Sequence, residues 1–140
     1  MKRILKTVLV FLLTISVVCM QISAVSNAYG LNLDRRWTNV EFLDCYLNFH
    51  GTQATYNVFV GGNTDVTNIT ATATLYYKNS SGSWVEIPKD WSYDVDDNIL
   101  TINETFTAVS GREYKVEFEA TVSTPDYDEP VQDTQVKTCP

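Results

Sequence analysis

The sequence contains few of the residues from which catalytic centres and nucleic-acid-binding surfaces are built. Its 140 residues include one histidine, His50, and 10 lysine or arginine residues against 17 aspartate or glutamate residues. A net charge of −7 repels phosphate backbones and anionic membrane surfaces. We therefore expect no nucleic-acid partner. His50 lies in the turn-like stretch FHGT, and no pattern around it indicates a catalytic role.

Long apolar runs are also scarce, and the one present lies near the N-terminus. Residues Val8 to Met20 are almost all apolar, three basic residues precede them, and the small residues Ser26 and Ala28 follow. This pattern is typical of a secretory signal peptide, which we expect to be cleaved after Ala28. The run is short for a retained membrane anchor. A lipoprotein signal is disfavoured because Val18 stands where a small residue is expected.

This interpretation divides the chain into a signal peptide (1–28), a lead-in (29–39) and one domain (40–140). The protein would then be secreted or attached to the cell surface, with no stable membrane insertion. All 17 acidic residues but only 7 of the 10 basic residues follow Ala28, so the mature net charge is 7 − 17 = −10. The remaining 112 residues (140 − 28) are enough for one domain with a sizeable core.

Cysteine is rare as well, since the chain has three and the signal peptide would remove Cys19. Cys45 and Cys139 remain as a pair in an exported chain, which predicts a disulfide. The bridge would close a loop of 139 − 45 = 94 residues. The chain-entropy estimate for such a loop is about 4–5 kcal/mol. Two free thiols are the alternative. A zinc site with His50 lacks a fourth ligand, so no cofactor is expected.

Apolar residues recur with a period of two almost everywhere in the mature sequence, so the fold class is all-β with no helix. A change of parity between Phe42 and Cys45 indicates a bulge near Leu43–Asp44. The spacing of the strands is typical of a single antiparallel β-sandwich. Seven strands are predicted: Val40–Phe49, Ala54–Val60, Ile69–Tyr77, Trp84–Ile87, Ile99–Phe106, Ser110–Val122 and Val131–Thr138.

The apolar pattern of the third and fourth predicted strands determines the register in which they pair. Setting Leu75 opposite Ile87, and Tyr77 opposite Val85, aligns the apolar faces, whereas a slip of one residue would set Leu75 against a glutamate. Tyr76 and Trp84 then share the outer face, and two further aromatic residues follow closely. The set Tyr76, Trp84, Trp91 and Tyr93 is either a platform for a ligand or partner, or packing at a sheet edge.

The stretch GREYKVEFEA, from Gly111 to Ala120, resembles the sixth strand of fibronectin type III domains. That resemblance implies a buried Tyr114 ring whose hydroxyl is hydrogen-bonded to nearby backbone. Two departures favour the broader description of an Ig-like sandwich: the second strand lacks the usual core tryptophan, and the cysteines occupy other strands. With the signal peptide, the chain resembles small secreted sandwich proteins of Gram-positive bacteria, which are mostly uncharacterised. In Ig-like topologies the first and last strands can run side by side, which would bring Cys45 and Cys139 together.

Two acidic stretches are candidate calcium or catalytic sites. Asp94, Asp96 and Asn98 match the first three ligands of an EF-hand loop, but Ile99 and Thr105 occupy its glycine and glutamate positions. The remaining interpretations of this stretch are a weaker calcium site of another geometry and a solvated turn. The second stretch allows a calcium site, a hydrolytic carboxylate pair or a solvated loop. It comprises Asp126, Asp128, Glu129 and Asp133.

These observations favour an exported, non-enzymatic module that binds an extracellular protein or glycan. A secreted effector or inhibitor acting through its loops is the alternative, and a small acidic-site hydrolase is a third. Asn68, Asn79 and Asn103 each begin an N-glycosylation tripeptide, which would be used only in a eukaryote.

Overall fold

Alternating apolar and polar residues form strands along nearly the whole of the described chain. The computed structural model describes residues 37–140, so the predicted signal peptide lies outside the described residues. The described part contains eight strands and no helix, and therefore no helix that could cross a membrane. The strands are β1 (Val40–His50), β2 (Gln53–Gly62), β3 (Asn68–Lys78), β4 (Trp84–Ile87), β5 (Ser92–Val95), β6 (Ile99–Thr107), β7 (Glu113–Ser123) and β8 (Asp128–Thr138).

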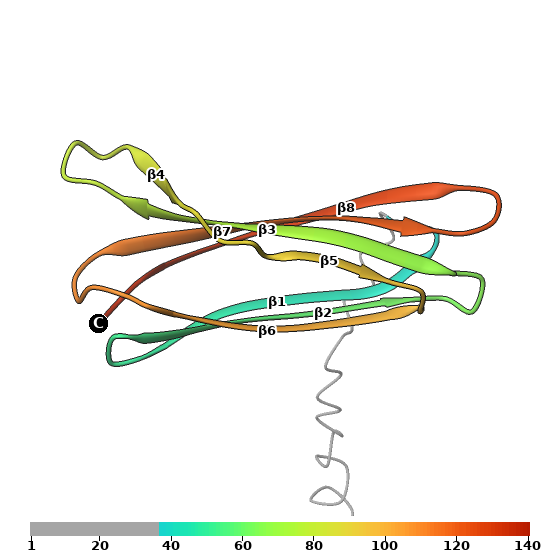
Figure 1. Cartoon of the computed structure of the whole chain (residues 1–140), viewed down its shortest axis with the longest axis horizontal. Helices are drawn as coiled ribbons and strands as arrows, with labels where there is room; N and C mark the ends of the chain where they lie inside the picture. The colour runs from blue at the N-terminus through green and yellow to red at the C-terminus, as the bar shows by residue number, and fades with distance from the viewer. Residues whose placement is uncertain (1–36) are drawn as a thin grey trace, which may run out of the picture. The chain divides into compact units, whose positions relative to one another are not determined.

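The strands form two antiparallel sheets that face each other across one core (Figure 1). The first sheet has the order β1-β2-β6. The second has the order β4-β3-β7-β8, and β5 also pairs with β3. The predicted all-β class is confirmed, whereas the predicted count of seven strands is wrong. The additional strand is β5, which follows the strand break at Pro88 and pairs with the first half of β3, while β4 pairs with its second half.

The predicted register of β3 and β4 is confirmed, because Leu75 faces Ile87 and Tyr77 faces Val85. The bulge in β1 is displaced from its predicted position. The register shifts between Val40 and Phe42, so Glu41 is the extra residue. The Phe42 ring lies directly over Gly61, where a β-carbon would come within 1.9 Å of the ring. Because glycine has no side chain, the Phe42 ring can lie across β2 at this point. The irregularity in β1 therefore lies next to Phe42 and not near Leu43–Asp44.

Aromatic rings fill much of the core between the sheets. Trp91 is only 5% exposed and stacks on Tyr56, with ring centroids 6.3 Å apart. Phe106 and Tyr114 continue the cluster at 5.4 Å. The Tyr56 hydroxyl is fully buried, with the Cys45 thiol as its polar neighbour. Burial raises the pKa of Tyr56, so its hydroxyl stays protonated.

The first and last strands lie side by side and run parallel, as expected from the resemblance. Near the start of β1, backbone N–H groups at residues 38–40 donate to the Glu129 carboxylate of β8. Near the other end, Lys137 Nζ donates to Asn48 Oδ1 at 3.1 Å. Residue 37 and residue 140 consequently lie at opposite ends of the sandwich (Figure 1).

This alignment separates the two cysteines. Residues of β1 lie beside residues about 89 positions later in β8, so Cys45 lies near Asp133–Thr134, not near Cys139. The Cys139 thiol instead donates to the Gly51 carbonyl at 3.4 Å, six residues beyond Cys45 (51 − 45 = 6). At about 3.3 Å per residue this offset is roughly 20 Å, whereas a disulfide needs Cα atoms within about 7 Å. Both thiols are free and buried, and the predicted disulfide is absent.

We expect the unreduced protein to contain both thiols. Burial raises the pKa of Cys45 to about 12, so its reactive thiolate is scarce at neutral pH and alkylation of the native protein should be slow. In denaturant without reductant, iodoacetamide should modify Cys45 and Cys139 completely, as measured by peptide mass mapping. Recovery of a linked Cys45–Cys139 peptide would contradict the structure.

Candidate functional site

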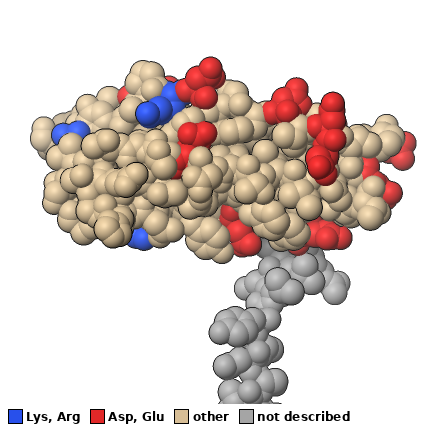
Figure 2. All heavy atoms as spheres, turned by 60° about the horizontal axis from the view of Figure 1, so that its bottom comes forward, with Lys and Arg blue, Asp and Glu red and all other residues tan. Residues whose placement is uncertain are grey.

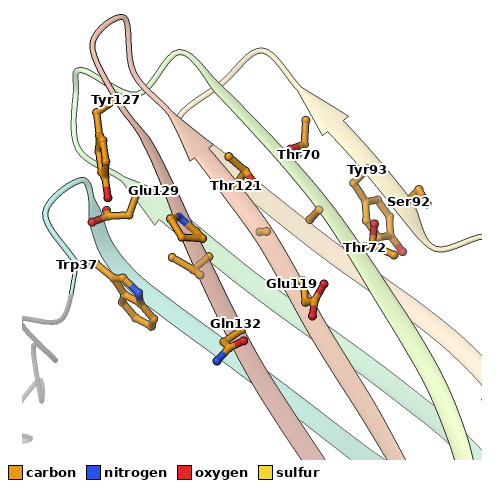
Figure 3. A pocket seen from close by; sticks show the side chains of 14 residues that line it. Trp37, Thr70, Thr72, Ser92, Tyr93, Glu119, Thr121, Tyr127, Glu129 and Gln132 are labelled. Atoms are coloured by element: carbon orange, nitrogen blue, oxygen red, sulfur yellow. The ribbon is translucent and has the colours of Figure 1, made fainter.

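An open hollow of about 890 Å³ lies across one half of the five-stranded sheet (Figure 3). It crosses four strands, β5, β3, β7 and β8, and reaches Trp37, three residues before β1. Its lining residues are Trp37, Thr70, Ala71, Thr72, Ser92, Tyr93, Glu119, Ala120, Thr121, Tyr127, Glu129, Pro130, Val131 and Gln132.

The hollow exists because the outward side chains in this part of the sheet are short. Thr72 of β3 has Ser92 on one side and Glu119 on the other, and Thr70 has Thr121 beside it. Further along the same strands the outward residues are larger and include an aromatic ring and lysine stems. The step from small to large outward side chains leaves the backbone of the first part accessible. It creates a depression without any break in the ladder.

Two aromatic residues stand on one side of the hollow. Figure 3 shows Trp37 and Tyr127 there beside Glu129, with Ser92 and Tyr93 across from them. Trp37 is half-buried against the core, and Tyr127 is 54% exposed. A tight turn holds Tyr127, since its N–H donates to Thr124 Oγ1 at 3.1 Å and its carbonyl accepts from Thr124 N at 2.9 Å.

Glu129 positions this side of the hollow. Its carboxylate is 4% exposed and accepts hydrogen bonds from Thr38 N and Asn39 N, both at 2.7 Å, and from Val40 N at 3.2 Å. These donors lie just before and at the start of β1. The carboxylate therefore fastens the segment that carries Trp37 to the edge of β8.

The lining of the hollow, as far as residues 37–140 form it, is acidic and includes no lysine or arginine. Among its lining residues only Glu119 and Glu129 are charged. A second hollow of about 750 Å³ shares Tyr127 and is lined by Asp65 and Asp126 among hydroxyl-bearing residues. Figure 2, which views the molecule from the side of the three-stranded sheet, also shows acidic residues alone on the right of the visible face. An anionic ligand would meet uncompensated repulsion here, so a neutral or cationic ligand is favoured.

The structure separates the aromatic set Tyr76, Trp84, Trp91 and Tyr93. Tyr76 and Trp84 share the outer face of the five-stranded sheet, but lysines lie over their rings. Lys115 Nζ is 4.3 Å from the Tyr76 centroid and 5.2 Å from that of Trp84, and Lys78 Nζ is 5.3 Å from that of Trp84. Trp84 is therefore half-buried, and its ring is partly covered by cations.

Ion pairs hold those lysines in place. Lys78 Nζ pairs with Glu113 at 2.7 Å, and Lys115 Nζ pairs with Glu117 at 2.5 Å. The hydrogen bond from Lys115 is the main cause that lowers the pKa of Glu117. Desolvation, together with a hydrogen bond to Glu117, raises the pKa of Tyr76. The rings of Tyr76 and Trp84 are therefore already in contact with lysine side chains of the same molecule.

Trp91 and Tyr93 face the core side of the sheet. Trp91 is buried, as described above, and the half-buried Tyr93 donates from its hydroxyl to Glu104 Oε1 at 2.9 Å. Burial, followed by this hydrogen bond, raises the pKa of Tyr93. Trp91 is therefore removed from the predicted platform, and Tyr93 contributes only to the side of the hollow. The sequence pattern missed this because β5 was not expected.

The acidic stretches do not assemble a metal centre. Among residues 37–140, no group of three or more His, Cys, Asp or Glu side chains is arranged to hold a metal ion. Asp94 and Asp96 both accept from Asn68 Nδ2, at 2.7 and 3.1 Å. Asn98 points elsewhere, toward the carbonyl oxygens of Gly62 and Asn63. Asp126 and Asp128 are both exposed, within or next to the β7–β8 turn.

The remaining sequence candidates have structural environments. His50 is exposed at the end of β1. Tyr114 is 2% exposed, and its hydroxyl accepts from Val109 N at 2.8 Å. Gly111 adopts a positive φ of 77° in the turn before it, a conformation that favours glycine.

Sequence reasoning missed Trp37 and Tyr127 as residues of the site. Trp37 lies in the segment assigned to the lead-in, and Tyr127 lies in a loop noted only for its carboxylates. One usable signal was present, because both are large aromatic residues outside the strands and aromatic residues in loops are candidates for contact surfaces.

No protein-family model and no curated protein matches the sequence. Among solved structures, the chain is similar to part of a β-glucuronidase from Parabacteroides merdae at 14% identity and a TM-score of 0.42. The match covers 68% of this chain and 13% of that chain, and a second structure of the same enzyme, with glycerol in its active site, gives the same values. A similarity of this size indicates neither a family nor a function for this chain.

Proposed function

We propose that this protein is an exported, non-enzymatic Ig-like sandwich that binds an extracellular protein or glycan at or near the cell surface. The hollow on the five-stranded sheet is the proposed binding site. The observation that carries the proposal is its composition: three aromatic residues, several hydroxyl groups and two carboxylates surround an accessible stretch of sheet. Such a surface offers ring faces and hydrogen-bonding groups, which suit recognition better than bond cleavage.

The Ig-like description rests on connectivity. In the order β1-β2-β6 and β4-β3-β7-β8, consecutive strands β2 and β3, and again β5 and β6, cross from one sheet to the other. The buried Tyr114 at the start of β7, bonded to backbone five residues earlier, supports the same assignment. Export rests on the N-terminal sequence pattern alone.

A hydrolase is less well supported by the geometry. Both Glu129 oxygens accept backbone hydrogen bonds. Asp133 accepts from Gln135 Nε2 at 2.7 Å, and Asp126 and Asp128 are exposed. An effector or inhibitor acting through its loops is the second candidate. The hollow between the β2–β3 and β7–β8 loops, lined by Asp65, Asp126 and Tyr127, favours it.

The proposed site predicts a charge preference that binding arrays can measure. The probes are neutral, anionic and cationic glycans, together with extended peptides of each net charge. We expect retention of neutral or cationic probes and rejection of anionic ones, because the described lining of the hollow has carboxylates and no lysine or arginine. Glu119→Lys and Tyr127→Ala should each weaken binding about tenfold, roughly 1.4 kcal/mol.

The matched control is Val136→Ala. Val136 is 49% exposed on β8 but does not line the hollow. Binding through the hollow should be unchanged in that variant. Retention of anionic probes, or binding that neither Glu119→Lys nor Tyr127→Ala affects, would contradict the proposed site.

A further inference from the structure

The outward residues of the three-stranded sheet form five rows across β1, β2 and β6: Phe42–Gly61–Ile99, Asp44–Phe59–Thr101, Tyr46–Asn57–Asn103, Asn48–Thr55–Thr105 and His50–Gln53–Thr107. Asp44 is the only aspartate, glutamate, lysine or arginine in these rows. By contrast, the outer face of the other sheet carries ion pairs and several unpaired carboxylates.

Exposed apolar side chains gather on this neutral face. Three of the six large hydrophobic residues that are strongly exposed among residues 37–140 belong to its rows: Tyr46 (54%), Phe59 (40%) and Ile99 (47%). The Phe42 and Phe59 rings stack at 4.7 Å with an interplanar angle of 21°. Gly61 lets the Phe42 ring lie flat on the sheet, so the pair forms a low apolar ridge.

An amide pair lies next to the ridge. Asn103 Nδ2 donates to Asn57 Oδ1 at 2.7 Å across β2 and β6. This bond fixes both side chains and leaves the Asn57 amide N–H₂ and the Asn103 carbonyl oxygen for a ligand. Tyr46 completes the same row, opposite Asn57. Row three therefore presents a ring, a donor and an acceptor side by side on a rigid sheet.

We infer that the neutral face is a second binding site, which takes an uncharged polysaccharide chain. A sugar unit has apolar C–H faces, which pack on aromatic rings, and hydroxyl groups, which both donate and accept hydrogen bonds. The rows offer both kinds of group and no lysine or arginine. A highly charged ligand would find no counter-charge apart from Asp44. This site lies on a different sheet from the hollow and does not depend on it.

A second copy of the protein is the competing occupant. Residues 37–140 contain 16 acidic and 5 basic residues, a net charge of 5 − 16 = −11, so two copies repel each other at long range. The amides and threonines of rows three and four would also need matched partners in such an interface. Polysaccharide hydroxyls supply those partners without charge, and the polysaccharide is therefore favoured.

The test uses insoluble chitin and cellulose in depletion assays and soluble laminarin in calorimetry, with heparin as an anionic comparison. We expect binding to at least one of the three neutral polysaccharides and none to heparin. Tyr46→Ala and Phe59→Ala should each weaken that binding tenfold or more, and Tyr46→Ala should leave the thermal midpoint unchanged because its side chain is solvent-exposed. The matched control is Val136→Ala, which changes an exposed apolar residue outside both the neutral face and the hollow and should bind normally.

Three results would overturn the inference. One is the absence of binding to all three neutral polysaccharides. Another is binding that Tyr127→Ala removes and Tyr46→Ala leaves intact, which would assign the glycan to the hollow. The third is a dimer, measured by light scattering, that Tyr46→Ala converts to a monomer. Loss of binding in Tyr46→Ala alone would support the neutral face and leave the proposed function of the hollow to be judged by its own variants.

Discussion

Replacing Tyr114 with alanine is expected to lower the free energy of unfolding by about 3–5 kcal/mol, the usual cost of deleting a large core aromatic ring. The ring is 2% exposed and contacts Phe49 and Phe106, with centroids 5.9 and 5.4 Å away. Its loss also leaves Val109 N–H without the acceptor that it has at 2.8 Å. Chemical denaturation monitored by tryptophan fluorescence measures the change.

Tyr114→Phe separates the two contributions. It keeps the ring and removes only the hydroxyl, so we expect a loss of about 1 kcal/mol, the usual net value of one hydrogen bond. Tyr127→Ala, at an exposed tyrosine, should change stability by less than about 0.5 kcal/mol. A change that small in Tyr114→Ala would show that the ring does not support the core.

Replacing Glu129 with alanine is expected to cost about 3 kcal/mol or more. The substitution leaves Thr38, Asn39 and Val40 N–H groups without their carboxylate, and each buried donor without a partner costs about 1–3 kcal/mol. Glu129→Gln keeps one acceptor oxygen and should lose less. In Glu129→Ala, hydrogen-exchange measurements should also show that the amides of residues 38–40 exchange with solvent faster than those in the middle of β1.

Asp128→Ala is the matched control for Glu129. Asp128 is the preceding residue, exposed and without a described hydrogen bond from its side chain, so its removal should leave stability and exchange nearly unchanged. If Glu129→Ala behaved in the same way, the segment before β1 would not depend on this carboxylate.

Most of the fold could be predicted from alternation alone. The apolar faces of β3 and β7 are continuous, and only one register of β3 and β4 aligns Leu75 with Ile87. The short strand β5 could not be found in this way. Four residues of mixed polarity after a proline carry too little periodicity, and they become a strand only because β3 is long enough to pair with two short strands.

The site was less predictable, because it depends on contacts between distant segments. Tyr76 and Trp84 were correctly placed on one face by register, yet nothing in the pattern showed that Lys78 and Lys115 would lie over them. The Cys45–Cys139 prediction failed for a similar reason. Parallel neighbours were anticipated, but the offset between β1 and β8 is decided by where Glu129 meets Val40, a buried polar contact that residue spacing does not encode.

The parallel arrangement of β1 and β8 has a mechanical consequence. Tension applied through residue 37 and residue 140 would pull β1 and β8 lengthwise in opposite directions, past the strands that hold them. The ladder bonds to β2 and β7 would then be loaded together in shear, not opened one at a time as in peeling. The Glu129 carboxylate sits where the force would enter β1. A domain connected in this way resists extension along its long axis more strongly than extension applied across its strands.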